Sequence, residues 1–198
     1  MKVGYVVLYE DGELVISKNH TLLQKKIIKD YGEFEDTDVP WKNEIEKIEK
    51  VHLLNQIKSN YMKEWFNDCM NLNILINFQN LDTSDCTDFS SMFYGCKSLQ
   101  NIKELQNWNV SNCTDFSYMF AYCESLQNIN ELETWNVSNG INFSCMFEFC
   151  TLLNEIYLSN TLDILKKEMF NQCNKTLKIY WKNHIYTYED LLEYQRIY

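Results

Sequence analysis

The stretch TSDCTDFSSMF at residues 83–93 decides the fold, because it is repeated along the chain. It recurs as VSNCTDFSYMF at residues 110–120 and as VSNGINFSCMF at residues 137–147, and the step is 27 residues both times. A fixed period of this length lies in the range of leucine-rich repeats, in which each copy buries its apolar face against the next copy. The sequence therefore predicts a solenoid.

The apolar residues on either side of this stretch follow the same period. Five copies carry Met-Phe or Trp-Phe, with a cysteine three positions after the phenylalanine, and the first and last copies are irregular. These cysteines are Cys69, Cys96, Cys123, Cys150 and Cys173. No Cys-x2-Cys pair occurs, and a column of five cannot pair completely. Buried free thiols are therefore favoured over disulfides or a metal site.

Each unit contains signals for two local structures. Thr87-Asp88-Phe89 and its equivalent at residues 114–116 predict the start of a short helix or 3-10 segment, because a hydroxyl can cap the free amides and a carboxylate favours the positive end of the dipole. Residues 98–102 and 125–129 predict short strands. Stacking would place these strands in a narrow parallel sheet, with Cys, Leu, Ile, Met, Phe and Trp in columns that point inward.

The segments on both sides of the repeats predict covers for the ends of the stack. Residues 2–17 alternate around Asp11-Gly12, which predicts a β-hairpin. Apolar residues have helical spacing over residues 21–31, and residues 44–58 predict a helix or a helix-strand join. A hairpin and a short helix are expected after residue 177. Capping explains both flanks, and a functional N-terminal module is the alternative.

These features together predict an α+β fold class: a short leucine-rich-repeat solenoid of about five repeats, with an α+β N-terminal cap and a C-terminal cap. The 198 residues are enough for such an organisation. We expect the N-terminal module at residues 1–61, the solenoid at residues 62–180 and the C-terminal cap at residues 181–198.

Signatures of the common catalytic and cofactor sites are absent from the sequence. There is no Gly-rich phosphate loop, no G-x-S-x-G and no H-E-x-x-H, and the three histidines fall in three different segments. We therefore expect no enzymatic activity, no catalytic residues, no cofactor and no metal. No stretch approaches the roughly 18 apolar residues of a membrane span, and no signal peptide is visible. A cytoplasmic location is expected, with the cell surface as the alternative.

Negative charge is concentrated on the repeats. The chain has a formal net charge of −10 and a pI near 4.8, and residues 61–160 hold 3 lysines against 12 carboxylates. Such a face disfavours direct binding to nucleic acid and attracts basic proteins. The candidate partner-binding residues are Asp82, Asp85, Asp88, Glu104, Asp115, Glu131, Lys103 and Asn130. Solubility and helix-start aspartates are the alternative explanation of this charge.

The sequence WNVSNCTDFSYMFAYCESL at residues 108–126 carries a resemblance to a known family. Its pattern resembles the BspA-like leucine-rich repeats, which were first associated with bacterial surface proteins. The resemblance covers residues 62–180. It implies the fold of those repeats and a role as a surface adhesin, although a shared fold alone does not fix function.

Two functions stay open, and both are non-enzymatic protein binding. The first is an intracellular inhibitor that docks its acidic repeat face on a basic nucleic-acid-handling protein as a nucleic-acid mimic, for example a phage-encoded antagonist of bacterial immunity such as an anti-CRISPR protein. The alternative, implied by the resemblance, is a fragment of a bacterial surface adhesin that binds host proteins. In both cases we expect a protein partner, no direct nucleic-acid contact and no membrane contact, and the oligomeric state is not determined by the sequence.

Overall fold

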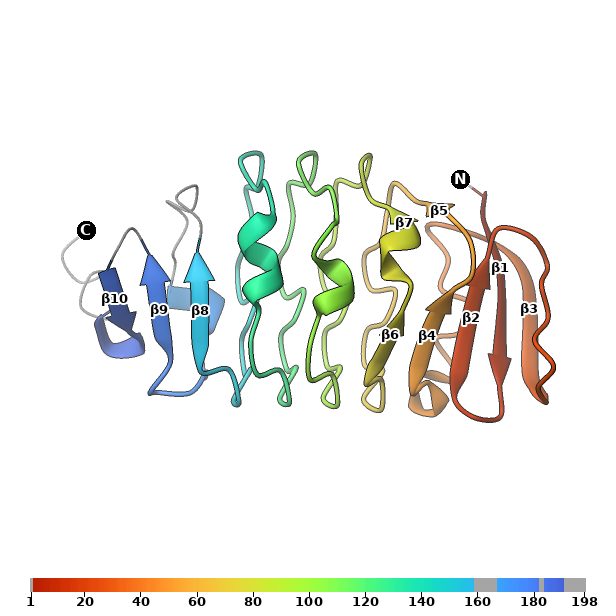
Figure 1. Ribbon diagram of the computed structural model, residues 1–198, viewed down its shortest axis with the longest axis horizontal. Coiled ribbons are helices and arrows are strands. Elements are labelled where there is room, and N and C mark those ends of the chain that lie inside the picture. The colour runs from red at the N-terminus through yellow and green to blue at the C-terminus, as the bar shows by residue number, and fades with distance from the viewer. Residues whose placement is uncertain (1, 159–166, 182–183, 191–198) are drawn as a thin grey trace.

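The computed structural model describes residues 2–158, 167–181 and 184–190 and is built from short strands and 3-10 helices (Figure 1). The chain runs from a sheet at the N-terminal end, through a row of stacked turns, to a second sheet at the C-terminal end. The elements in chain order are β1 Lys2–Tyr9, β2 Glu13–Ser17, β3 Ile27–Glu35, η1 Ile45–Lys47, β4 Lys50–Leu53, β5 Ile57–Lys58, β6 Ile74–Ile76, η2 Phe78–Asn80, β7 Leu81–Asp82, η3 Lys103–Leu105, η4 Asn130–Thr134, β8 Glu155–Leu158, η5 Lys167–Phe170, β9 Lys178–Trp181 and β10 His184–Thr187.

The N-terminal sheet has five strands in the order β3-β1-β2-β4-β6. β1 and β2 form the predicted antiparallel hairpin, in which Leu8 is paired with Leu14. Gly12 lies in the tight turn with a φ of +75°, and its N–H donates to the Tyr9 carbonyl oxygen at 3.1 Å. A side chain at Gly12 would also meet the Lys47 carbonyl oxygen at 2.9 Å, so this position needs glycine.

The other strands of this sheet connect the N-terminal segment to the repeats. β2 pairs in parallel with β4, and β4 pairs in parallel with β6. The helix predicted over residues 21–31 is wrong, because residues 27–31 belong to β3, which pairs antiparallel with β1. Two adjacent isoleucines begin β3, and β-branched residues favour strands. In residues 44–58 the helix-strand join is confirmed, with a single 3-10 turn, η1, before β4.

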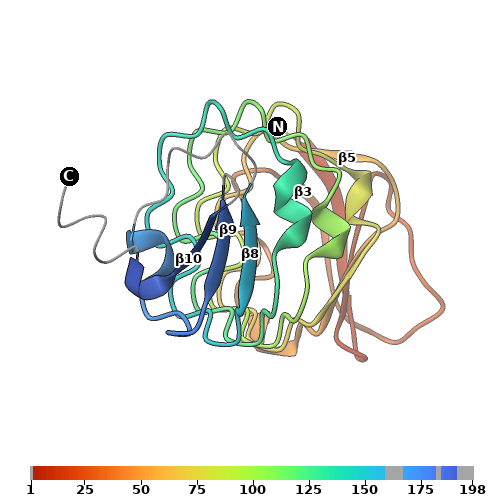
Figure 2. The ribbon, with the colours of Figure 1, turned by 60° about the vertical axis from the view of Figure 1, so that its left-hand side comes forward.

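Each repeat forms one turn of the chain, and successive turns lie side by side (Figure 1). They follow nearly the same path when seen more nearly along the stack (Figure 2). Backbone hydrogen bonds join the turns: the Phe89 N–H donates to the Asp115 carbonyl oxygen at 2.9 Å, and the Phe93 N–H donates to the Met119 carbonyl oxygen at 2.9 Å. Backbone groups that a helix would pair within itself are thus satisfied by the neighbouring turn.

The predicted α+β fold class is wrong. Among the described residues the elements are ten strands in three sheets and five 3-10 helices, and only residues 188–190 are α-helical. The expected α+β N-terminal cap is a mostly β structure. At the C-terminal end, β9 and β10 form the predicted hairpin. The greater part of the short helix expected after it, residues 191–198, lies outside the described residues.

The helix starts predicted in each repeat, as at residues 87–89, are wrong for a physical reason. The Asp88 carboxylate accepts the N–H of Ser90, two positions later, at 2.7 Å. This bond closes a tight turn of the kind that aspartate favours, and it does not cap a helix. Ser91 then has a φ of 56°, and Tyr118 in the next turn has a φ of 58°. A left-handed residue cannot continue a right-handed helix.

The continuous parallel sheet predicted along the repeats is also wrong. β6 and β8 are strands, but residues 98–102 and 125–129 are not, and η3 and η4 follow them. β6 has the sequence Ile-Leu-Ile and β8 has Glu-Ile-Tyr-Leu, which favour strands. The equivalent residues between them read Asn-Ile-Lys and Asn-Ile-Asn, and asparagine is depleted in strands. Only an isolated bridge joins Asn128 to Glu155.

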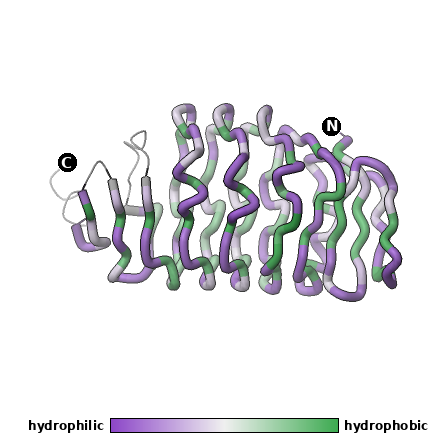
Figure 3. The backbone as a smooth tube through the Cα atoms, in the orientation of Figure 1, coloured by the Kyte–Doolittle hydropathy of each residue, from purple (hydrophilic) through white to green (hydrophobic). Residues whose placement is uncertain are grey.

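The predicted inward columns are confirmed. Apolar and polar residues alternate along the turns (Figure 3), and most of the buried apolar side chains form one cluster that extends from Val3 to Ile179. A second, small cluster contains Val7, Tyr9 and Val15. The phenylalanine of each Met-Phe or Trp-Phe pair stacks on its equivalent in the next turn. The centroid distances along this phenylalanine stack are 5.5, 5.6, 5.8 and 5.6 Å, and its members are Phe66, Phe93, Phe120, Phe147 and Phe170.

Five of the cysteines form a second column beside the phenylalanine stack, namely Cys69, Cys96, Cys123, Cys150 and Cys173. All eight cysteines are free thiols, and seven of them are buried. The thiol of Cys123 donates to the Phe93 carbonyl oxygen at 3.2 Å, and Cys150 makes the same bond to Phe120 at 3.1 Å. The core is continuous from the N-terminal sheet through the repeats, so no break in packing marks a domain boundary. The domain boundaries expected after residues 61 and 180 therefore stay predictions.

Candidate functional site

Two of the predicted partner-binding residues, Asp82 and Asp85, share one lysine. Nζ of Lys58 lies 2.7 Å from Oδ2 of Asp85 and 3.8 Å from Oδ2 of Asp82. The hydrogen bond to Asp85 raises the pKa of Lys58, and hydrogen bonds from Ser84 lower the pKa of Asp82. Part of the negative charge at this place is therefore balanced within the chain.

Asp88 and Asp115 lie directly opposite each other in adjacent turns and form an isolated parallel bridge. The Asp115 carboxylate accepts the backbone N–H of Ser117 at 2.8 Å and its hydroxyl at 2.6 Å. In the following turn the equivalent residue is Asn142, whose side-chain amide donates to Asp115 at 3.1 Å. These two predicted residues thus hold the turns in shape, and the row of acids ends at the asparagine.

The other four predicted residues lie on η3 and η4, which contact each other. Lys103 and Asn130 are exposed and occupy the same position in successive turns. Oε2 of Glu104 accepts the backbone N–H of Phe78 at 3.1 Å. Oε2 of Glu131 is buried and has no hydrogen-bond partner among the described residues. The predicted residues therefore lie at several places on the turns, and their role in binding a partner stays a prediction.

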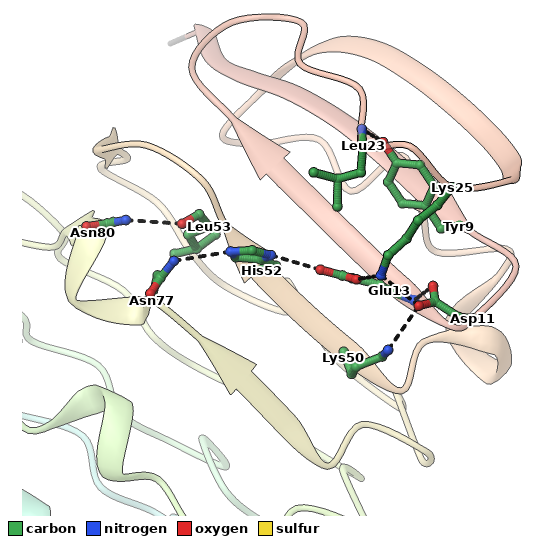
Figure 4. Close-up of polar contacts among 10 residues, drawn as sticks. All are labelled: Tyr9, Asp11, Glu13, Leu23, Lys25, Lys50, His52, Leu53, Asn77 and Asn80. Atoms are coloured by element: carbon green, nitrogen blue, oxygen red, sulfur yellow. Dashed lines mark hydrogen bonds and ion pairs between the residues drawn. The ribbon is translucent and has the colours of Figure 1, made fainter.

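A polar network in the N-terminal sheet surrounds a buried carboxylate (Figure 4). Glu13 on β2 is only 5% exposed. Its Oε1 lies 2.8 Å from Nδ1 of His52 on β4, and its Oε2 forms an ion pair with Lys25. Nε2 of His52 in turn lies 3.1 Å from the side-chain nitrogen of Asn77. A buried carboxylate needs such partners, because an unpaired charge in the interior is strongly destabilising.

Asp11 extends this network at the end of the hairpin. Its Oδ2 accepts hydrogen bonds from Lys25 at 2.8 Å and from Lys50 at 3.1 Å, and the bond from Lys25 lowers the pKa of Asp11 to about 2. Burial acts to raise the pKa of Glu13, but the hydrogen bonds from Lys25 and His52 outweigh it and leave the pKa lowered. Two carboxylates are thus matched by two lysines, an arrangement that stabilises the junction of the strands.

An aromatic ladder, which the sequence analysis did not single out, lies on the surface of the turns. Tyr94, Tyr122 and Phe149 come from successive turns, and their ring centroids are 5.2 and 4.6 Å apart. Tyr118 lies 6.5 Å from Tyr94 and is 39% exposed, and the other three residues are half-buried. These four residues are called the aromatic ladder below.

Three of the four ladder residues have a left-handed backbone. The φ angles are 58° at Tyr118, 61° at Tyr122 and 58° at Phe149. The equivalent positions of the preceding turn hold Ser91 and Gly95, so the turn itself does not require a ring there. Bulky residues are uncommon at positive φ and are disfavoured there by about 1 kcal/mol or more. The sequence does carry a signal for the aromatic ladder: the repeats differ from one another at these positions, while their core positions match.

Two carboxylates, Asp68 and Glu148, lie near Tyr94 of the aromatic ladder. Burial raises the pKa of Tyr94, and the nearby charges of Asp68 and Glu148 add to this effect. Lys97 is ion-paired to Glu124 at 2.8 Å. Asp68 also lines a neighbouring cavity of about 420 Å³, which is formed by Thr37, Asp38, Val39, Lys42, Ile45, Glu64, Trp65, Asn67 and Asp68.

Metal binding and thiol chemistry are the other functions that cysteine and carboxylate side chains can support. Within the described ranges, no group of three or more His, Cys, Asp or Glu side chains is placed to hold a metal ion. Burial raises the pKa of the Cys69, Cys86 and Cys113 thiols to about 12, which opposes formation of the thiolate. No helix in the described part of the chain is long and apolar enough to cross a membrane.

Comparison with known proteins gives one structural relative and one family. The solved structure of a leucine rich cell surface protein from Faecalibacterium prausnitzii is similar over 93% of this chain, with a TM-score of 0.51 and 16% sequence identity. The chain covers 56% of that protein, so it spans about half the length of its relative. No curated protein matches the chain. The resemblance to BspA-like leucine-rich repeats is confirmed, and neither comparison supports the predicted inhibitor. The family model described as "Mycoplasma protein of unknown function, DUF285" matches residues 60–182, more than half of the chain, and the chain therefore belongs to that family.

Proposed function

We propose that this chain is a non-enzymatic protein-binding module of a cell surface protein. The proposal adopts the adhesin alternative of the sequence analysis, in place of the intracellular inhibitor and its cytoplasmic location. It is supported by the likeness to a leucine rich cell surface protein over 93% of the chain. A role in contacting other proteins is the coarse function that this likeness favours.

The observation that carries the proposal is the repetition of the turns. Each turn is fixed to the next by backbone hydrogen bonds and by the phenylalanine stack, so equivalent surface positions form columns along the molecule. A surface built on such columns is already ordered before a partner arrives. Less conformational entropy is then lost when a complex forms.

The chemistry of the described side chains fits binding better than catalysis. The buried thiols are poor nucleophiles, because their pKa values are raised. The carboxylate of Glu13 is held by Lys25 and His52, and it is buried in the sheet rather than open to a substrate. No metal site and no cofactor are needed for the proposed function.

Binding of the labelled chain to intact cells tests this proposal. Fluorescently labelled chain is titrated onto cells that display candidate host proteins, and bound label is measured by flow cytometry. We expect saturable binding, competition by unlabelled chain, and loss of binding after the cells are treated with protease. In parallel, an antibody against the chain should label intact cells of the source organism.

Two results would contradict the proposal. If binding does not saturate, or survives protease treatment, the chain does not recognise a protein on those cells. If the antibody labels the cells only after they have been permeabilised, the chain is not exposed at the surface.

A further inference from the structure

We propose that the aromatic ladder and the acidic cavity beside it form a binding site for an extended segment of a partner protein that carries arginine or lysine side chains. The inference rests on the proposed function, because it names the surface and the class of partner for the same protein-binding role. The site differs from the acidic residues that the sequence analysis predicted, and it combines rings with charges.

The turn does not require the rings of the aromatic ladder. Tyr118 is 39% exposed, and Tyr122 keeps a left-handed backbone with a φ of 61°. One turn earlier, Ser91 and Gly95 occupy the same positions and keep a left-handed backbone, with φ angles of 56° and 70°. A strained backbone position that carries an exposed ring, as Tyr118 does, points to a role outside the core. Tyrosine is also enriched among the residues that dominate the energy of protein interfaces.

The charge around the ladder selects a cationic partner. Asp68 and Glu148 act on the Tyr94 ring, and Asp38 and Glu64 line the cavity that Asp68 also lines. Lys42 is the single lysine among the cavity's lining residues. Guanidinium and ammonium groups are attracted both to such carboxylates and to the faces of aromatic rings.

The dimensions of the ladder fit a short extended segment. The rings of Tyr94, Tyr122 and Phe149 are separated by 5.2 and 4.6 Å. The resulting path of roughly 10 Å equals the length of about three residues of extended chain. Because alternate side chains of such a chain point to the same side, one apolar or aliphatic stem can lie on the rings while a cationic group enters the cavity.

A nona-arginine peptide labelled with fluorescein serves as the probe, and nona-glutamate serves as the negative probe. Binding is measured by fluorescence anisotropy at about 50 mM and about 300 mM salt, because screening weakens charge attraction. The variant Tyr118→Ser/Tyr122→Gly removes two rings but uses the residue types found at the same positions of the preceding turn. The far-UV circular dichroism spectrum should therefore be unchanged, and unfolding should stay cooperative with a midpoint lowered by the loss of the ring contacts of Tyr122 with Tyr94 and Phe149. The affinity for nona-arginine, measured well below that midpoint, should fall about tenfold.

A pair of charge variants separates a local site from general attraction. Asp68→Asn/Glu148→Gln and Asp85→Asn/Glu133→Gln change the net charge equally, but only the first pair lies at the ladder. We expect about a tenfold loss of affinity for the first pair and less than about a twofold loss for the second. Equal losses, or a larger loss for the second pair, would overturn the proposal, as would unchanged binding by the ring variant.

Two further outcomes keep this inference distinct from the proposed function. If the chain binds cells through a protein but does not bind nona-arginine, the cationic partner is wrong and the proposed function stands. If nona-arginine is bound at the ladder but the chain binds no protein on intact cells, the site stands and the surface role fails. Binding of neutral oligosaccharides that depends on Tyr118 and Tyr122, without binding of nona-arginine, would replace the protein segment by a carbohydrate.

Discussion

Phe120→Ala removes a ring from the middle of the phenylalanine stack, and we expect it to reduce the free energy of unfolding by about 3–5 kcal/mol. Phe120 is fully buried, and its ring centroid lies 5.6 Å from that of Phe93 and 5.8 Å from that of Phe147. Each stacked pair contributes about 0.5–1.5 kcal/mol beyond the burial of apolar area. Since two pairs are lost, the cost should lie near the upper end of the range.

The last ring of the stack provides a comparison of the same chemistry. Phe170 is also fully buried, but it stacks on one phenylalanine of the column, Phe147, at 5.6 Å. Phe170→Ala should therefore cost about 0.5–1.5 kcal/mol less than Phe120→Ala. Tyr157 stacks on Tyr180 at 4.4 Å but is 37% exposed, so Tyr157→Ala is a surface control that we expect to cost less than about 1.5 kcal/mol.

Urea denaturation followed by far-UV circular dichroism measures these differences. Tryptophan fluorescence gives a second probe of the same transition, and coincident curves support a two-state treatment. A cost for Phe120→Ala equal to or below that for Phe170→Ala would refute the reasoning. The rings would then contribute by burial alone, without an added contribution from each neighbour in the stack.

Three other predictions concern the thiols, the polar network and one glycine. A thiol reagent should modify Cys145 in the native chain and the remaining cysteines only after denaturation, as counted by absorbance, because the other seven cysteines are buried and Cys145 is partly exposed. The pKa values of Asp11 and Glu13 are lowered on folding, so their stabilisation is present above the unfolded-state values and should be lost as the pH falls from about 4.5 towards 2. This loss is measured as a falling midpoint of thermal unfolding, and Glu13→Gln should reduce the pH dependence. Gly95→Ala should destabilise the chain by more than about 1 kcal/mol in the same assay, because Gly95 has a φ of 70° and a new Cβ would meet Oδ1 of Asp68 at 2.4 Å.

The repeat period predicted which side chains meet, but it did not predict the backbone between them. A step of 27 residues is enough to place Phe93 on Phe120, because equivalent positions of stacked turns must become neighbours. The helix start at Asp88 failed because an aspartate can also close a tight turn by accepting the N–H of the residue two positions later, and hydrogen bonds to the next turn favour that alternative. Such bonds depend on the stacking itself and have no local signal.

Long-range contacts explain why the N-terminal network was not predicted. Glu13 and His52 are 39 residues apart, and neither belongs to the repeat pattern. The pairing of β2 with β4 brings them together. In this mixed sheet β2 is antiparallel to β1 on one side and parallel to β4 on the other. Sequence spacing predicted the hairpin of residues 2–17, because that structure depends on neighbouring residues and a glycine turn.

The differences between the repeats point to function more directly than their similarities do. Positions that face the core are fixed by packing, since each phenylalanine or cysteine must fit the one beside it. Ser91, Tyr118 and Cys145 share one surface position, while Gly95, Tyr122 and Phe149 share another, and the turn accommodates all of these residues with nearly the same φ angle. The same backbone thus carries a ring in one turn and a small residue in another, although a side chain at Gly95 itself would meet Oδ1 of Asp68. The turn therefore does not require the rings at these positions, and a partner that contacts the aromatic ladder would give them a role beyond their stacking on one another.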